Sequence, residues 1–360
     1  MNTCAHPGHC ILFLERPAHR RLTIIHNALC GNGRGDIILS SGLFVDEWKA
    51  LDRRYPQYTC SEKIVHYERA GPSLPMSVGG VSYADRILSL PCHCPSILQR
   101  WAARHRHWPS PDIVQKVVSL GAYLTPVGSK GSEQTHMEWR ICFNTGETEL
   151  VNNLNDTQAK VYVLLKMILK NVLRPCKKEI TSYVMKNIVL WQAESNPQNE
   201  FRERSLFHWL HDGLRGLRTA ILTQKLSYYM IPERNLMAAT GLHDTQRNKW
   251  VADITDMMAD GPRVILRLQK IRKAVIASPE PMLWFSKRRM ELEILSMQSM
   301  QFRLRDIICR NKNGVVESDT ILSDINRRTW EIGIDVVLRA ISEGGDVDNT
   351  IQYYQGLLMA

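Results

Sequence analysis

The amino-acid sequence predicts an α+β fold, with a mixed-sheet core followed by an all-helical domain. Residues 1–150 are rich in Gly, Pro and short apolar runs of strand length. From residue 151 onward Gly and Pro become rarer, and apolar residues recur with the 3.6-residue period of a helix. Because the strand-like runs precede the helical patterns and do not alternate with them, the order favours α+β over α/β.

Four short apolar runs in the first part are predicted as strands. They are Cys10–Leu14, Ile37–Leu39, Val81–Leu90 and Met137–Phe143. The last run has the clearest pattern, because bulky apolar residues occupy every second position and polar residues lie between them. That alternation is typical of a strand with one face in the core and one in water.

Three helices are predicted next. They are Thr157–Leu173, Glu179–Ala193 and Arg204–Leu226. The first can be capped by Asn155 or Asp156 and is ended by Pro175. Each has an apolar stripe, so we expect the three to pack together.

Three domains follow from this pattern. Residues 1–150 form the mixed core, residues 151–260 the helical domain, and residues 261–360 a helical extension of unknown role. In the extension, Val264–Ala277 and Met290–Ile308 have helical patterns, and Asn311–Gly314 is predicted as a turn.

Composition narrows the class of protein. Hydrophobic residues at 44% and charged residues at 23% are ordinary globular values and argue against a disordered chain, a collagen or a coiled coil. The 46 Lys and Arg residues exceed the 36 Asp and Glu residues, giving a formal charge of +10. A positive balance favours an anionic partner such as a nucleotide or a nucleic acid.

Other features concern the cellular compartment and metals. No apolar run approaches the roughly 18 residues of a membrane helix, so no membrane partner is expected. Nine cysteines, an odd number, do not suggest a disulfide framework, so a cytoplasmic or nuclear location is predicted. Cys92, His93 and Cys94 lack a second ligand pair at zinc-site spacing, so no zinc is predicted.

Two groups of residues could contact a nucleotide or a nucleic acid. Ser182 and Lys186 are four apart on one helical face, with Tyr183 beside them. A hydroxyl, a ring and an ammonium in that grouping could hold a phosphate and a base. Separately, Arg100, Arg104 and Arg106 could contact nucleic-acid phosphates, or could form a solvated basic surface.

Four motifs in a fixed order resemble the Mab-twenty-one-like family, which includes cyclic GMP-AMP synthase and its animal relatives. They are residues 138–147, Tyr162 to Lys166, Ser182–Tyr183 to Lys186, and residues 228–236. The resemblance covers about residues 7–237, and its upstream part is similar to the expanded mollusc members of the family.

The resemblance implies a nucleotidyltransferase core followed by a helix-hairpin-helix or helix-two-turn-helix domain, with a nucleotide between the lobes. Active members hold two Mg²⁺ or Mn²⁺ ions on three carboxylates. By motif position, Asp85 resembles the third carboxylate and Arg140 the strand arginine near the nucleotide. Lys166 and Ser182 resemble phosphate or sugar contacts, and Tyr183 the ring that stacks on a base.

The sequence also departs from the family pattern. Before Asp85 no two acidic residues are two positions apart, so the acid-x-acid pair is absent, and the Gly-Ser turn expected upstream of it is missing too. One carboxylate cannot position two metal ions. As written, the chain is therefore predicted to be an inactive pseudoenzyme with no functional metal cofactor.

Three functions remain open. The first is an inactive, truncated family member that binds ATP, GTP or double-stranded RNA in innate sensing. The second is an active nucleotidyltransferase that makes a cyclic nucleotide second messenger and whose N-terminus is missing from the gene model. The third is a non-enzymatic developmental or interaction scaffold. The sequence predicts no oligomeric state.

Overall fold

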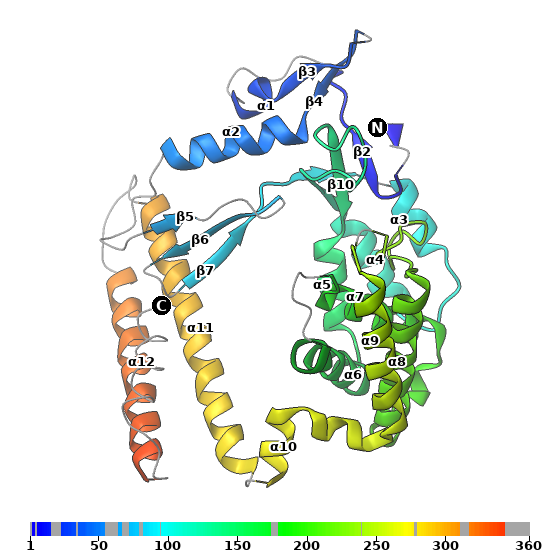
Figure 1. Ribbon diagram of the computed structural model, residues 1–360. Coiled ribbons are helices and arrows are strands. Elements are labelled where there is room, and N and C mark those ends of the chain that lie inside the picture. The colour runs from blue at the N-terminus through cyan, green and yellow to red at the C-terminus, as the bar shows by residue number, and fades with distance from the viewer. Residues whose placement is uncertain are drawn as a thin grey trace. The chain divides into compact units, whose positions relative to one another are not determined.

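The computed structural model describes residues 2–3, 6–15, 23–33, 35–54, 64–66, 72–78, 82–93, 95–173, 179–238, 240–276, 279–309 and 317–342. The chain forms two compact units (Figure 1). The first unit comprises residues 1–50 and 88–273, and the second comprises residues 51–87 and 274–360. The predicted α+β class is confirmed, whereas the predicted domain boundaries stay predictions.

An antiparallel five-stranded sheet organises the first unit. Its order is β1 (Asn2–Thr3), β2 (His9–Ile11), β10 (Glu138–Cys142), β9 (Ala122–Thr125) and β8 (Leu90–Cys92). The central strand β10 pairs with β2 on one side and β9 on the other. Trp139 on β10 is completely buried, as the alternating pattern predicts.

A small hairpin extends the strand layer, and a helix follows it. β3 (Leu29–Gly31) pairs with β4 (Ile37–Leu39), which has the bounds predicted from the sequence. α1 (Thr23–Asn27) precedes the hairpin and α2 (Ser41–Arg54) follows it. The indole of Trp139 donates a hydrogen bond to the carbonyl of Leu39 at 2.8 Å, which ties the hairpin to β10.

Three helices complete the sheet-containing part of this unit. They are α3 (Pro95–Ala102), α4 (Pro111–Leu120) and α5 (Asn144–Asn152). A β-carbon at Gly146 of α5 would lie 3.0 Å from the side chain of Val117 on α4, so a larger residue would push the two helices slightly apart. The close packing fixes the position of α5, which starts directly after β10.

A bundle of four α-helices forms most of the remainder of the first unit (Figure 1). They are α6 (Asp156–Ile168), α7 (Ser182–Ser195), α8 (Leu206–Thr223) and α9 (Asp244–Ala259). A π-helical turn, Leu169–Leu173, extends α6, and 3₁₀ turns occupy Gln198–Glu200, Glu203–Ser205 and Gly261–Arg267. The three helices predicted here lie within a few residues of their expected bounds and share one apolar core.

The N-terminus of α6 offers a direct test of helix capping. Asn155 accepts a hydrogen bond from the backbone N–H of Gln158, and the Gln158 side chain accepts one from the backbone of Asn155, both at 3.0 Å. This reciprocal arrangement is a capping box. We expect Asn155→Ala to lower the free energy of unfolding by about 1 kcal/mol, measured by urea denaturation. An unchanged denaturation midpoint would contradict this role.

The second unit contains a sheet and a long helical hairpin. β5 (Ile64–His66), β6 (Leu74–Val78) and β7 (Ser82–Arg86) form an antiparallel sheet. α11 (Pro279–Cys309) and α12 (Glu317–Ser342) pack side by side. α10 (Gln269–Ile276) precedes them, and most of it belongs to the first unit. The predicted turn at Asn311–Gly314 lies outside the described residues.

Among the described residues, no helix combines the length and the hydrophobicity needed to cross a bilayer.

Candidate functional site

A buried carboxylate joins three parts of the first unit. Glu147 on α5 is only 2% exposed. It accepts hydrogen bonds from the hydroxyls of Tyr183 at 2.8 Å and Tyr228 at 2.7 Å, and it forms an ion pair with Lys186. These donors come from α7 and from the segment after α8. Glu147 therefore holds the helical bundle against the helix that follows β10.

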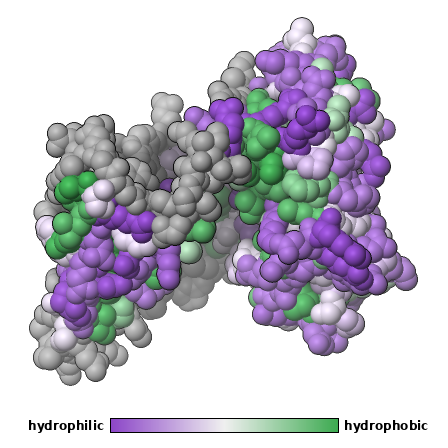
Figure 2. All heavy atoms as spheres, turned by 90° about the horizontal axis from the view of Figure 1, so that it is seen from below, coloured by the Kyte–Doolittle hydropathy of each residue, from purple (hydrophilic) through white to green (hydrophobic). Residues whose placement is uncertain are grey.

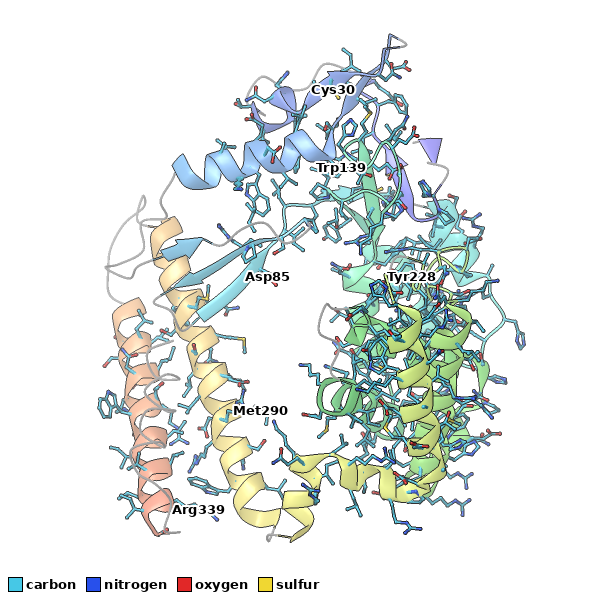
Figure 3. All side chains as sticks on the ribbon, viewed as in Figure 1. Cys30, Asp85, Trp139, Tyr228, Met290 and Arg339 are labelled. Atoms are coloured by element: carbon cyan, nitrogen blue, oxygen red, sulfur yellow. The ribbon has the colours of Figure 1, made fainter. Side chains whose placement is uncertain are left out.

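The two tyrosines at Glu147 are held as proton donors. Burial raises the pKa of both phenols, and the negative charge of Glu147 raises each further. The Tyr183 and Tyr228 rings lie 5.8 Å apart. Tyr228, labelled in Figure 3, lies among the dense side chains around α7. Both phenols therefore remain neutral donors to Glu147 at physiological pH.

Cationic side chains lie over the aromatic rings around this carboxylate. Lys186 lies 4.7 Å from the centre of the Tyr183 ring and Arg234 lies 5.2 Å from that of Tyr228. On α6, Lys166 lies 5.0 Å from the centre of the Tyr162 ring. We call the set formed by Glu147, Tyr162, Lys166, Tyr183, Lys186, Tyr228 and Arg234 the Glu147 cluster.

Tyr162 also interacts electrostatically with Glu147. Its pKa is raised by burial and by the negative charge of Glu147. Tyr162 and Lys166 are one helical turn apart on α6, which places this ring and this ammonium on one face. The cluster thus combines rings and cations from α6, α7 and the segment around Tyr228 and Arg234.

The strand side of the site carries a further arginine and a buried histidine. Arg140 on β10 is paired in register with His9 on β2. Burial lowers the pKa of His9 to about 4, and the positive charges of Arg234 and Arg140 lower it while Glu138 raises it. Arg140 and Arg234 therefore both act on one imidazole, which links the strand side to the Glu147 cluster.

Positive charge exceeds negative charge in this region. Within the described part of the chain, Arg140, Lys166 and Arg234 form no ion pair, whereas Lys186 is paired with Glu147. Each of the three unpaired cations is half-buried. Unpaired cations beside aromatic rings are the groups that an anion with a ring would use.

The residues predicted from the sequence lie in both units. Arg140, Lys166, Ser182 and Tyr183 are in the first unit, and Ser182 is the first residue of α7, directly before Tyr183. Lys166 and Tyr183 are members of the Glu147 cluster. Asp85 is exposed on β7 of the second unit and is labelled in Figure 3. The roles assigned to these residues by resemblance stay predictions.

A two-metal centre needs several carboxylates close together. Among the residues that the structure describes, no group of three or more His, Cys, Asp or Glu side chains is placed to hold a metal. Glu147, the buried carboxylate nearest the predicted nucleotide contacts, is already bound by two hydroxyls and an ammonium. This donor set does not fit a two-metal centre.

The Arg104 guanidinium makes internal contacts. It forms an ion pair with the buried Glu194 at 2.8 Å and donates a hydrogen bond to the carbonyl of Tyr229 at 2.7 Å. It also lies 4.7 Å from the centre of the Trp191 ring and 4.8 Å from that of Tyr229. Such contacts favour a structural role for Arg104.

Arg106 also makes internal contacts, whereas Arg100 is exposed to solvent. Arg106 lies 4.5 Å from the centre of the Trp101 ring and donates hydrogen bonds to the carbonyls of Trp101 and Arg104. Burial lowers its pKa. Arg100 is exposed on α3. Of the three arginines predicted to contact nucleic acid, only Arg100 has this open surface position.

An apolar groove lies elsewhere on the bundle. Its volume is about 560 Å³, and Asp156 and Lys160 are the charged residues of its lining. The apolar lining consists of Ala159, Val163, Leu164, Met167, Leu206, Phe207, Ile265 and Ile271. This lining does not suit a phosphate, so the groove is distinct in chemistry from the Glu147 cluster.

Sequence reasoning missed the central residue of the site. Glu147 is the last residue of the first family motif, and Tyr228 and Arg234 lie in the fourth, but none of the three has a role assigned from the sequence. The available signal was the i, i+3 spacing of Tyr183 and Lys186, which places a donor and a cation on one helical face and calls for a buried acid opposite them.

Comparison with protein families gives two matches. Residues 49–153 match the Mab-21 protein nucleotidyltransferase domain. Residues 157–256 match the Mab-21 protein HhH/H2TH-like domain. No curated protein matches the chain. The matched ranges include β10, α5, α6 and α7, and they exclude α11 and α12.

Proposed function

Because this chain belongs to the Mab-21 family, we propose that it binds a purine nucleoside triphosphate, ATP or GTP, without performing nucleotidyl transfer. The observation that carries this proposal is the surplus of half-buried cations beside aromatic rings in the first unit. Arg140, Lys166 and Arg234 lack ion-pair partners among the described residues, and two of them lie over tyrosine rings.

Each group has a defined part in this proposal. Lys166 and Arg140 supply positive charge for the phosphates, and an arginine can donate to two phosphate oxygens at once. The hydroxyl of Tyr183 is fixed on Glu147, so its ring is held in one orientation and can stack on a base. Ser182 at the start of α7 adds a hydroxyl next to that ring.

We propose binding without nucleotidyl transfer because the carboxylates that this reaction requires are missing from the sequence given. Two-metal transfer needs carboxylates that neutralise and position both ions. The sequence supplies Asp85 by motif position but no acid-x-acid pair before it. Glu147 is occupied by Tyr183, Tyr228 and Lys186 and cannot replace that pair without losing these contacts.

A nucleotide titration tests the binding step. We expect the full chain to bind a fluorescent GTP or ATP analogue, and Lys166→Ala or Arg140→Ala to weaken binding by about tenfold, as loss of one charged contact to phosphate implies. Lys160→Ala is the matched control, since Lys160 lies on the same helix but pairs with Glu203 at 3.6 Å at the surface.

The outcomes separate binding from catalysis. Absence of binding by the wild-type chain, or an equal loss in Lys160→Ala, would refute the assigned site. Formation of any dinucleotide product from ATP and GTP with Mg²⁺, abolished by Asp85→Ala, would refute the assignment as a non-catalytic member. Double-stranded RNA is the less supported ligand, because Arg104 and Arg106 make internal contacts.

A further inference from the structure

The hairpin of α11 and α12 has a buried seam. Ile332 and Val336 of α12 are fully buried and form a cluster with Leu292 of α11. Two ion pairs join the helices beside this cluster, Arg288 with Asp335 at 2.9 Å and Arg328 with Glu291 at 2.6 Å. One face of α12 is therefore fully used in packing against α11.

The opposite face of α12 is also apolar, and it is exposed. Trp330 is 67% exposed, Ile334 52%, Leu338 60% and Ile341 51%. Residues two apart on a helix point to opposite sides, so Ile334 and Leu338 lie opposite Ile332 and Val336. We call Trp330, Ile334, Leu338 and Ile341 the outer stripe.

The spacing of the outer stripe is that of a helix-packing seam. Successive members are four, four and three residues apart, and Ile334 and Ile341 are one heptad apart. A helix that is solvated on one side carries polar residues there. A contiguous apolar stripe of this size marks a surface that another molecule covers.

The charge of the hairpin limits which kind of molecule could cover the outer stripe. The sequences of α11 and α12 contain eight basic and nine acidic residues, so the surplus of positive charge lies elsewhere in the chain. A nucleic acid would need a basic surface. A membrane-surface helix would need a polar face rich in Lys and Arg. The outer stripe therefore fits a protein.

We propose that the outer stripe binds the same stripe of a second copy of this chain, related by a two-fold axis. The nearly neutral hairpin lets two chains of formal charge +10 approach there without repulsion. Arg327 lies beside the stripe between the acidic Asp324 and Glu331. Charges of both signs at one edge suit a self-complementary interface.

The exposed area is sufficient for such a dimer. The four side chains of the outer stripe leave roughly 500 Å² exposed, so a face-to-face pair would bury roughly 1,000 Å², which is the lower bound for a specific interface. Figure 2 shows hydrophobic residues interleaved with hydrophilic ones on the described surface of this unit. Trp330, the largest and most exposed member, would be the main anchor.

Analytical ultracentrifugation of the full chain across a concentration series tests the dimer. We expect the wild-type chain to dimerise and Trp330→Glu or Leu338→Glu to raise the dimer dissociation constant at least about 100-fold. Leu222→Glu is the matched control, because Leu222 on α8 is 52% exposed, as Ile334 is. Thermal unfolding of each variant confirms that it is folded.

Three outcomes would overturn the proposal. The first is a wild-type chain that stays monomeric at concentrations of about 50 μM, well above a micromolar dissociation constant. The second is an equal effect of Leu222→Glu and Trp330→Glu. The third is disruption by Met290→Glu but not by Trp330→Glu, which would place the interface on the exposed face of α11 (Met290 is labelled in Figure 3).

Discussion

Replacing Glu147 by alanine is expected to lower the free energy of unfolding by about 3–5 kcal/mol, as loss of one partner from a buried ion pair does. Three donors depend on this carboxylate, and the Lys186 ammonium, with only 18% of its side chain exposed, would lose its counter-charge. The hydroxyls of Tyr183 and Tyr228 would also lose their acceptor. An unpaired buried donor costs its full desolvation free energy.

A second acid on the same helix provides the control. Glu149 pairs at 2.8 Å with Lys116, whose side chain is 57% exposed, so the cation left by Glu149→Ala stays in water and the loss of stability should be much smaller. Guanidinium denaturation of both variants measures the difference. Glu147→Gln should fall between Glu147→Ala and wild type, because an amide oxygen still accepts from the tyrosines but leaves Lys186 without a counter-charge. Similar losses in Glu147→Ala and Glu149→Ala would contradict the central position of Glu147.

The elements that could be predicted from the sequence are those with strong local signals. α6 has a capping residue, an apolar stripe and a proline beyond its end, and its expected start at Thr157 differs from the observed start by one residue. β10 was found from its alternation. Local patterns of this kind need no knowledge of distant residues.

Other elements depend on contacts between distant residues. α12 was not predicted from the sequence, and its buried residues Ile332 and Val336 find their partner in Leu292 of α11, which is distant along the chain. The extension helix expected from Met290 begins instead at Pro279. Proline is favoured in the first turn of a helix, where its missing N–H costs no hydrogen bond.

The candidate site was predictable residue by residue but not as an arrangement. Motif position singled out Tyr183 and Lys166, which the structure places in one cluster. Glu147 acquires its role from Tyr228, 81 positions away in the sequence. A contact at that separation leaves no local period, so membership of a motif did not show that Glu147 is the buried acceptor of these donors.

Lowering the pH from 7 to 5 is expected to reduce the free energy of unfolding by about 2 kcal/mol through His9 alone. The pKa of His9 is about 4 in the folded chain and 6.5 in the reference state. The unfolded imidazole therefore takes up its proton at a higher pH than the folded one. The contribution of the neutral, buried histidine is complete above pH 6.5 and is lost as pH falls toward 4.

The pKa of His9 is lowered because its imidazole is buried and lies near positively charged side chains. Only 8% of His9 is exposed, and Arg234 and Arg140 oppose its protonation while Glu138 favours it. His9→Asn should remove most of this acid sensitivity whatever its effect at pH 7, as urea denaturation at pH 7, 6 and 5 would measure. Arg234→Met should reduce the sensitivity partly, because burial remains. Equal losses of stability between pH 7 and 5 in wild type and His9→Asn would show that His9 does not take up a proton on unfolding in this range.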